Sequence, residues 1–364
     1  MLNKSGLTYL INYHRVIGNI SLVYEINQKC SIWKKVLLTT WNIFLTMIIL
    51  YTIFMTALDI TIKQLLYSEQ EVNTPSKRNL LLVINNMGFF GFSFQSLISI
   101  IFLIVKGNRL LDHLENSNQD YINLKTERRI GLTLVVVQFL YAFSSELFVY
   151  LMQNINRSKN PFKNITKLIR DVFRYSLLFN TQLTVLSLIA YKSLIFSNEF
   201  KCFTKNNCKS RIDFKQIYTF VTNIHKSIKA FDKLINGYIF ITIIIQTASC
   251  LSMSTLAKNP SKYLVLGSAA LLESMAFLMA LCLICDRVSK SYVEFLDKLN
   301  DKLLGVYCNP ENFCEYNLFI NRLVELKSEM CFTACNLYVI NTKTFITCIL
   351  FCLSYIVIII QTNV

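Results

Sequence analysis

Charged residues are scarce in this sequence. Asp, Glu, Lys and Arg together make up 16% of its 364 residues, whereas 53% of the residues are hydrophobic. Soluble domains carry about 25% charged residues, because a surface in water needs them. The composition therefore argues against a water-soluble fold and favours a chain that is embedded in lipid.

Catalytic and metal-binding motifs are also missing. The chain contains no HExxH, GxSxG or Walker sequence. Its three His are His14, His113 and His225, which lie far from one another and offer no partners for a Cys-based metal site. We therefore expect neither an enzyme nor a bound metal or other cofactor, and we interpret most of the 12 Cys as small apolar side chains on helix faces.

Basic residues exceed acidic ones, and the formal net charge is +15. A protein that binds nucleic acid gathers its basic residues on one patch. Here they lie almost wholly between apolar runs, so we interpret them as loop charges that orient the chain in a membrane and contact anionic lipid. We expect the lipid bilayer as a partner, and no nucleic acid.

Seven stretches of the chain are long and apolar enough to cross a bilayer as helices, which takes about 20 residues. They are residues 36–58, 80–105, 130–152, 172–196, 237–257, 263–285 and 344–361. The four Pro all lie between these stretches, so each span can satisfy its backbone as an unbroken helix. The sequence thus predicts an all-α integral membrane protein with seven transmembrane helices.

The distribution of Lys and Arg predicts the orientation. Segments on one side of the membrane hold 25 of these residues and segments on the other side hold 10. The richer side faces the cytoplasm, so we expect a cytoplasmic N-terminus, an extracellular C-terminus and a multi-pass protein of the plasma membrane. Four regions follow: a cytoplasmic segment (1–35), the first six spans (36–285), cytoplasmic anchor helices (286–343), and the seventh span with a short outer tail (344–364).

The cytoplasmic segments show helical periodicity of their own. Residues 212–235 and 288–304 are apolar at helical spacing, and a further helix is predicted over 315–340. The apolar stripe of this last helix is formed by Phe319, Leu323, Leu326, Met330, Ala334 and Leu337. Such helices either lie on the inner membrane surface or pack among copies of the chain in an oligomer.

Two carboxyl groups fall inside the expected spans, Glu146 in the third and Glu273 in the sixth. A charge at bilayer depth costs several kcal/mol unless it is paired or hydrated. Amide and aromatic side chains lie at similar depths: Asn85, Asn86, Phe89, Phe90, Gln95, Tyr141, Phe143, Gln246 and Phe277. This set is typical of a small-molecule pocket in a helix bundle, and equally of hydrogen bonds that hold such a bundle together.

The last span carries a polar stripe. Thr347, Ser354 and Gln361 are spaced by seven residues, and because this spacing drifts by only about 20° per step they share one helical face. The rest of the helix is nearly all Ile, Val, Leu and Phe. The stripe either packs against a neighbouring helix or lines water.

The C-terminal segment 332–363 resembles the insect gustatory receptor family. The signature of that family in its last helix is Thr-Tyr, five apolar residues and Gln-Phe. Here Ser354 and Tyr355 are followed by Ile-Val-Ile-Ile-Ile and then by Gln361 and Thr362, so Ser replaces Thr and Thr replaces Phe. The motif covers about a tenth of the chain, and the expected topology matches that of the family along the rest.

This resemblance implies a gustatory receptor that acts as a ligand-gated, non-selective cation channel and is opened by a small-molecule tastant. The channel would be a homo- or heterotetramer with its last helices around the pore. Thr347, Ser354 and Gln361 would then form polar rings, with Val357 and Ile358 as a hydrophobic gate. The tastant would bind near Glu146, Glu273, Asn86, Gln246 and Tyr141.

Two other receptor classes compete with this interpretation. An insect odorant receptor shares the topology, and the segment from Ser354 to Gln361 favours the gustatory branch. A G-protein-coupled receptor also has seven spans, but its N-terminus is extracellular. The residues do not identify the class of tastant. They also do not distinguish a homomeric from a heteromeric channel.

The predicted orientation can be tested with an epitope at each end of the chain. In intact cells we expect antibody to label the C-terminal epitope and to reach the N-terminal epitope only after permeabilisation. An N-terminal epitope labelled in intact cells would reverse the orientation and favour a G-protein-coupled receptor.

Overall fold

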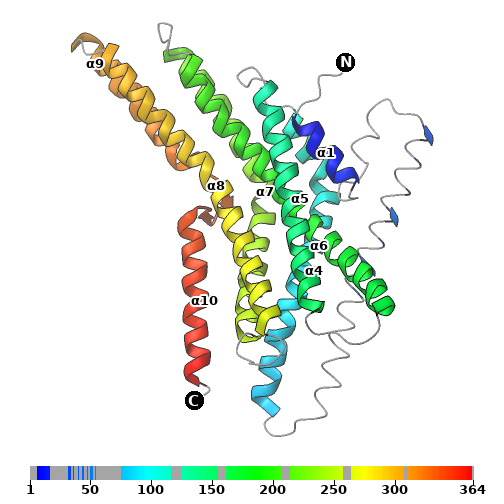
Figure 1. Ribbon diagram of the computed structural model, residues 1–364. Coiled ribbons are helices and arrows are strands. Elements are labelled where there is room, and N and C mark those ends of the chain that lie inside the picture. The colour runs from blue at the N-terminus through cyan, green and yellow to red at the C-terminus, as the bar shows by residue number, and fades with distance from the viewer. Residues whose placement is uncertain are drawn as a thin grey trace.

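The computed structural model is built almost entirely from helices (Figure 1). It describes residues 6–16, scattered positions between 32 and 54, and residues 75–115, 124–154, 161–206, 214–256, 264–306 and 310–362. The elements are α1 (Gly6–Val16), α4 (Pro75–Glu115), α5 (Leu124–Asn154), α6 (Pro161–Asn206), α7 (Phe214–Leu256), α8 (Leu264–Val306), α9 (Pro310–Glu325), the 3-10 helix η2 (Leu326–Glu329), β1 (Thr333–Ala334), β2 (Tyr338–Val339) and α10 (Thr342–Thr362). The predicted all-α class is confirmed.

The expected spans from the second to the seventh each fall on one helix, in order α4, α5, α6, α7, α8 and α10. The first expected span, 36–58, lies largely outside the described residues. Among the described stretches, Phe94–Glu115 and Phe214–Leu251 are long and apolar enough to cross a membrane, and Thr342–Tyr355 is a shorter apolar helix.

Proline marks the beginnings of helices. α4, α6 and α9 start at Pro75, Pro161 and Pro310. Proline lacks a backbone N–H, which the first turn of a helix does not need for its own hydrogen bonds. These prolines therefore leave the helices that follow them unbroken.

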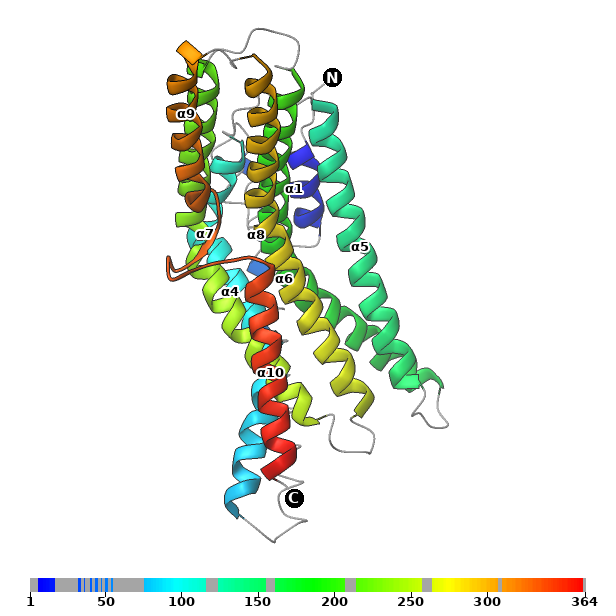
Figure 2. The ribbon, with the colours of Figure 1, turned by 90° about the vertical axis from the view of Figure 1, so that its left-hand side faces the viewer.

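Four of the helices are much longer than a bilayer requires, and one of them is α4 with 41 residues. α6 has 46 residues, and α7 and α8 have 43 each. At about 1.5 Å per residue each exceeds 60 Å, roughly twice the hydrocarbon thickness of a membrane. In Figure 2, α6, α7 and α8 continue beyond the upper end of α10 as a second section of the bundle, which α9 joins. The helices predicted over 212–235 and 288–304 are confirmed as parts of α7 and α8.

Aromatic side chains fill this second section. Phe203 of α6 stacks on Phe220 of α7 with ring centroids 3.9 Å apart. Phe200 lies beside both Tyr292 and Phe295 of α8, each at a centroid distance of 5.4 Å. All five are buried. Because aromatic rings bury large apolar areas, they hold α6, α7 and α8 together in this section.

The helix predicted over 315–340 is wrong beyond residue 325. α9 ends at Glu325, and η2 and a hairpin of β1 and β2 follow. Cys335 and Asn336 have φ of 49° and 58°, which turns the chain between the two strands. Met330 and Ala334 of the expected stripe are fully buried all the same, whereas Leu337 in the turn is 72% exposed. Helical spacing thus identified buried residues that reach the core without a helix.

Two glycines let α1 approach α5 closely. A Cβ atom on Gly6 would lie 1.9 Å from the carbonyl oxygen of Glu127, and a Cβ on Gly131 would lie 2.0 Å from the carbonyl oxygen of Gly6. Both clashes are with backbone, which cannot rotate away. Nearby, the buried ring of His14 hydrogen-bonds Ser187 Oγ at 2.8 Å and Thr184 Oγ1 at 3.1 Å, which ties α1 to α6 as well.

The substitution Gly131→Ala should displace α1 and destabilise the protein by about 1–3 kcal/mol, the usual cost of overpacking. The measurement is the temperature at which the purified protein loses its monodisperse gel-filtration peak. Gly237→Ala is the matched control, because no atom lies within 4 Å of its added Cβ and alanine favours a helix over glycine. An equal loss in both variants would contradict the close approach of α1.

Candidate functional site

Gln95 lies in a buried network between α4 and α7. Its Nε2 donates to Thr242 Oγ1 at 2.9 Å and to Tyr238 Oη at 3.2 Å. Tyr238 Oη is also 3.1 Å from Ser99 Oγ. All four side chains are buried. This network joins two helices, which is the bundle-holding role that polar groups take inside membrane proteins.

Glu273 has a different environment. Tyr141 of α5 donates a hydrogen bond from its hydroxyl to Glu273 Oε1 of α8 at 3.1 Å, and both side chains are partly buried. Phe277, one turn along α8, is buried. In the described part of the chain, the second carboxylate oxygen of Glu273 makes no further hydrogen bond, so it can accept one from a ligand or a water.

Three fully buried polar side chains lie on α7 and α8 at comparable distances from the connection between these helices. They are Gln246, Ser249 and Ser274, each no more than 1% exposed. Their side-chain oxygens have no hydrogen-bond partner among the described residues. An unpaired buried polar group costs about 1–3 kcal/mol. These oxygens are therefore places where a bound water or ligand would gain a hydrogen bond.

The structure describes the helices of two further residues of the expected pocket, but not their side chains. Asn86 is in α4 and Glu146 is in α5. Their side chains, like those of Asn85 and Phe143, fall outside the described part. The structure thus brings together Tyr141 and Glu273 from the expected set, and it leaves the role of Glu146 a prediction.

Metal ligands are not gathered anywhere in the part of the chain that the structure describes. Cys282 and Cys285 have the spacing of a CxxC pair on α8, and both are fully buried. Two thiols without further ligands make an incomplete zinc site, because structural zinc takes four.

The polar stripe of α10 faces away from its own bundle. Thr347 and Ser354 are exposed, and each hydroxyl donates at 2.9 Å to a carbonyl of its own helix, that of Lys343 and that of Leu350. Val357 and Ile358 are 50% and 54% exposed, and Gln361 is also exposed. The opposite side of α10 packs on α7 and α8, where Cys352 is buried and Tyr355 is partly covered. Among the described residues, the stripe therefore does not join helices.

The first turn of α10 is held by α8. Thr342 donates to Asp286 Oδ2 at 2.6 Å, and Lys290 Nζ lies 2.7 Å from the same oxygen. Burial would raise the pKa of Asp286, but the hydrogen bonds from Lys290 and Thr342 outweigh it and hold the pKa below its usual value. Asn341 Oδ1 accepts the N–H of Thr344 at 3.1 Å and so caps the helix.

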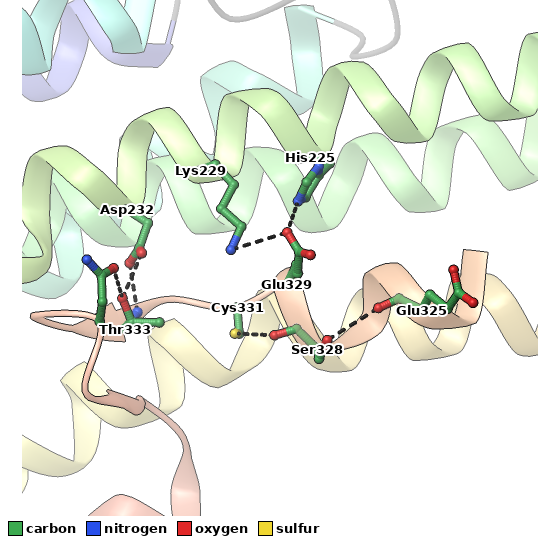
Figure 3. Close-up of polar contacts among 9 residues, drawn as sticks. His225, Lys229, Asp232, Glu325, Ser328, Glu329, Cys331 and Thr333 are labelled. Atoms are coloured by element: carbon green, nitrogen blue, oxygen red, sulfur yellow. Dashed lines mark hydrogen bonds and ion pairs between the residues drawn. The ribbon is translucent and has the colours of Figure 1, made fainter. Parts of the chain in front are cut away.

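The segment that leads into α10 is held by α7, through a row of side chains that we call the α7 latch: His225, Lys229 and Asp232 (Figure 3). Glu329 Oε2 lies 3.0 Å from His225 Nε2 and 3.5 Å from Lys229 Nζ. The hydrogen bond from His225 and the charge of Lys229 lower the pKa of Glu329. Asp232 accepts the N–H and the hydroxyl of Thr333, each at 2.7 Å.

The α7 latch was not predicted from the sequence. Its three members are spaced i, i+4 and i+7, so they share one face of a helix. A polar row on a helix with an otherwise apolar pattern was the available signal. Its partners could not be recognised from the sequence, because Glu329 and Thr333 lie about 100 residues further along the chain.

Two solved structures share this fold along nearly the whole chain. One is the insect olfactory receptor OR5 from Machilis hrabei, with a TM-score of 0.69, 13% sequence identity and 98% of both chains covered. The other is the same receptor in complex with eugenol, with a TM-score of 0.65, 12% identity and the same coverage. No protein-family model matches the sequence, and no curated protein matches it. The resemblance of the last helix to insect chemoreceptors thus extends to the fold of the full chain.

Loss of the Asp232 carboxylate should loosen the segment before α10. Hydrogen bonds to charged groups contribute about 1.5–3 kcal/mol each. Asp232 accepts two of them from Thr333, so Asp232→Ala should raise the population of locally open molecules by roughly 100-fold or more. The measurement is the rate of trypsin cleavage after Lys327 in the purified protein. Asp297→Ala removes an exposed carboxylate from α8 and should leave this rate unchanged; equal rates in the two variants would contradict the latch.

Proposed function

We propose that this protein is a chemosensory receptor that works as a ligand-gated cation channel of the plasma membrane. The observation that carries the proposal is the fold, which matches that of an insect olfactory receptor over 98% of both chains. The motif Ser354, Tyr355 and Gln361 in α10 supports it independently, because it was found in the sequence alone.

The exposed stripe of α10 supports its role as the pore lining. In a tetramer, four copies of Thr347, Ser354 and Gln361 make three rings of oxygen-bearing side chains around one axis. Such rings can partly replace the water shell of an ion. Val357 and Ile358 lie between the upper two rings and gate the pore by dewetting. Thr362 stands where the gustatory signature has Phe, so no bulky aromatic ring narrows that point.

The pair of Tyr141 and Glu273 supports a ligand site between α5 and α8. The remaining acceptor of Glu273 binds a donor of the ligand, and Phe277 contributes apolar surface. Asn86, Glu146 and Gln246 complete the proposed set, which suits a small polar or aromatic tastant. The receptor OR5 was solved in complex with eugenol.

A binding event reaches the pore only if the ligand prefers the open arrangement of the helices. α8 carries Glu273 near the proposed ligand site and Asp286 at the first turn of α10. A shift of α8 caused by the ligand therefore acts directly on the pore helix, while the α7 latch keeps the segment before it in place.

An odorant receptor is the second candidate. The two solved structures named above are of an olfactory receptor, whereas the segment from Ser354 to Gln361 favours the gustatory branch. We propose the gustatory assignment, with assembly as a homo- or heterotetramer with other gustatory receptor subunits.

The test combines current recording with cysteine accessibility. The chain is expressed alone in cells without chemoreceptors, and currents are recorded across a panel of tastants and odorants. In a background lacking Cys348 and Cys352, we expect an external charged thiol reagent to block agonist current after Ser354→Cys or Gln361→Cys. Tyr355→Cys is the matched control and should not be blocked, because Tyr355 lies about 100° from the stripe.

Equal block at positions 354 and 355, or block at none of them, would refute the pore assignment. In the same recordings, Glu273→Gln should weaken agonist potency by about tenfold, the effect of one charge-assisted hydrogen bond, with surface expression and unitary conductance unchanged. If Glu273→Gln alters only expression, the carboxylate is structural.

A further inference from the structure

Glu273 lies deep in the expected membrane without a basic partner. It is ten residues from the outer end of the span expected at 263–285. At about 1.5 Å per residue this is roughly 15 Å, the middle of a hydrocarbon layer of about 30 Å. No Lys, Arg or His of the described residues forms an ion pair with it. A carboxylate at this depth needs a cation or water to remain charged.

The buried lysine of the bundle lies too deep to supply that cation. Lys192 of α6 is the one fully buried lysine of the described residues, and it is 20 residues from the outer end of the span expected at 172–196. It is therefore about 15 Å closer to the inner surface than Glu273. Its Nζ donates to the carbonyl of His113 at 3.3 Å and lies 4.8 Å from the ring centroid of Phe196. The described residues thus offer no positive charge at the depth of Glu273.

A second unpaired acceptor lies on α5. Gln138 is one turn before Tyr141 on the same helical face, and it is only 4% exposed. Neither the oxygen nor the nitrogen of its side chain has a hydrogen-bond partner among the described residues. The hydroxyl of Tyr141 holds Glu273 Oε1 at 3.1 Å and so places the carboxylate beside this face of α5. The second oxygen of Glu273 and the amide oxygen of Gln138 are therefore two open acceptors on one site.

Aromatic rings complete the surroundings of the carboxylate. One is Tyr141 itself, and the other is Phe277, which lies one turn beyond Glu273 on α8 and is buried. The faces of aromatic rings attract cations. An alkylammonium group carries a positive charge and up to three N–H donors, whereas a hydroxyl is neutral and donates once. The site therefore suits an ammonium ion better than a hydroxyl.

We propose that the ligand of this receptor is a small primary or secondary organic amine, bound as its ammonium ion. One N–H donates to the free oxygen of Glu273 and a second donates to the amide oxygen of Gln138. The charge of the ligand neutralises the carboxylate, and its carbon skeleton packs against Phe277. The inference rests on the ligand site proposed between α5 and α8, and it names the chemical class that this site takes.

The test compares amines with alcohols of the same carbon skeleton, in pairs such as phenethylamine with 2-phenylethanol and tryptamine with tryptophol. At neutral pH a primary alkylamine is protonated, as a lysine side chain is. Dissociation constants are obtained from the dependence of the unfolding temperature of the purified full-length protein on ligand concentration. The amine of at least one pair should bind at least tenfold more tightly than its alcohol, because a hydrogen bond between charged groups is the stronger one.

Glu273→Gln keeps the shape of the side chain and removes its charge. It should weaken binding of the amine at least tenfold and change binding of the alcohol less than threefold. The matched control is Glu294→Gln, which makes the same change at an exposed position of α8 and should keep the preference for the amine. Gln138→Leu should weaken binding of the amine several-fold. Because it removes an unpaired buried amide, it tests the site even if Glu273→Gln fails to fold.

If no amine binds more tightly than its alcohol, the ammonium class is overturned. A preference for the amine that survives Glu273→Gln, or that Glu294→Gln reduces equally, would overturn Glu273 as the partner of the charge. These constants are measured without current, so their failure leaves the proposed channel standing. Conversely, a chain that conducts no agonist current contradicts the proposed function and leaves the binding constants unaffected.

Discussion

A peptide group inside a bilayer has no water to bond with, and most of this architecture follows from that constraint. Helices that satisfy every backbone group internally are the solution, and α6, α7 and α8 run for more than 40 residues each without a break. Among the residues that the structure describes, proline occurs only at helix starts, at Pro75, Pro161 and Pro310. In the described part of the chain, the irregular backbone of η2 and the β1–β2 hairpin lies between α9 and α10, away from the expected spans.

The same constraint gives α10 its unusual position. This helix packs on α7 and α8 with one side only, and its polar stripe bonds to its own carbonyls on the other side. Hydroxyls that are satisfied in this way remain compatible with either lipid or water. The stripe therefore needs no partner within one chain, and it is available for a water-filled axis shared by several chains.

Two sets of contacts fix the first turn of α10 and the segment that precedes it. Asp286 holds its first turn from α8, and the α7 latch holds the preceding segment through Glu329 and Thr333. These contacts lie in the section where aromatic rings lock α6, α7 and α8 together. Because α10 is attached at one end of this section, a small shift of α8 would move α10, the proposed pore helix, as a unit.

Most of the described helices could be predicted from the sequence, because apolar content and helical spacing are local properties of the chain. The exception is α1, and α4, α5 and α6 extend beyond the expected spans at both ends. The C-terminal motif likewise pointed to the fold that the chain shares with an insect olfactory receptor, before any fold was known. The helix predicted over 315–340 failed at Glu325, since a hairpin can place Met330 and Ala334 in the core at the same spacing. The partners of polar groups could not be predicted at all. Gln95 bonds Thr242 and Glu273 accepts from Tyr141, residues that are 147 and 132 positions away. Which amide joins helices and which carboxylate keeps a free oxygen depends on the neighbours that each helix acquires, and only the packing of the long helices decides that.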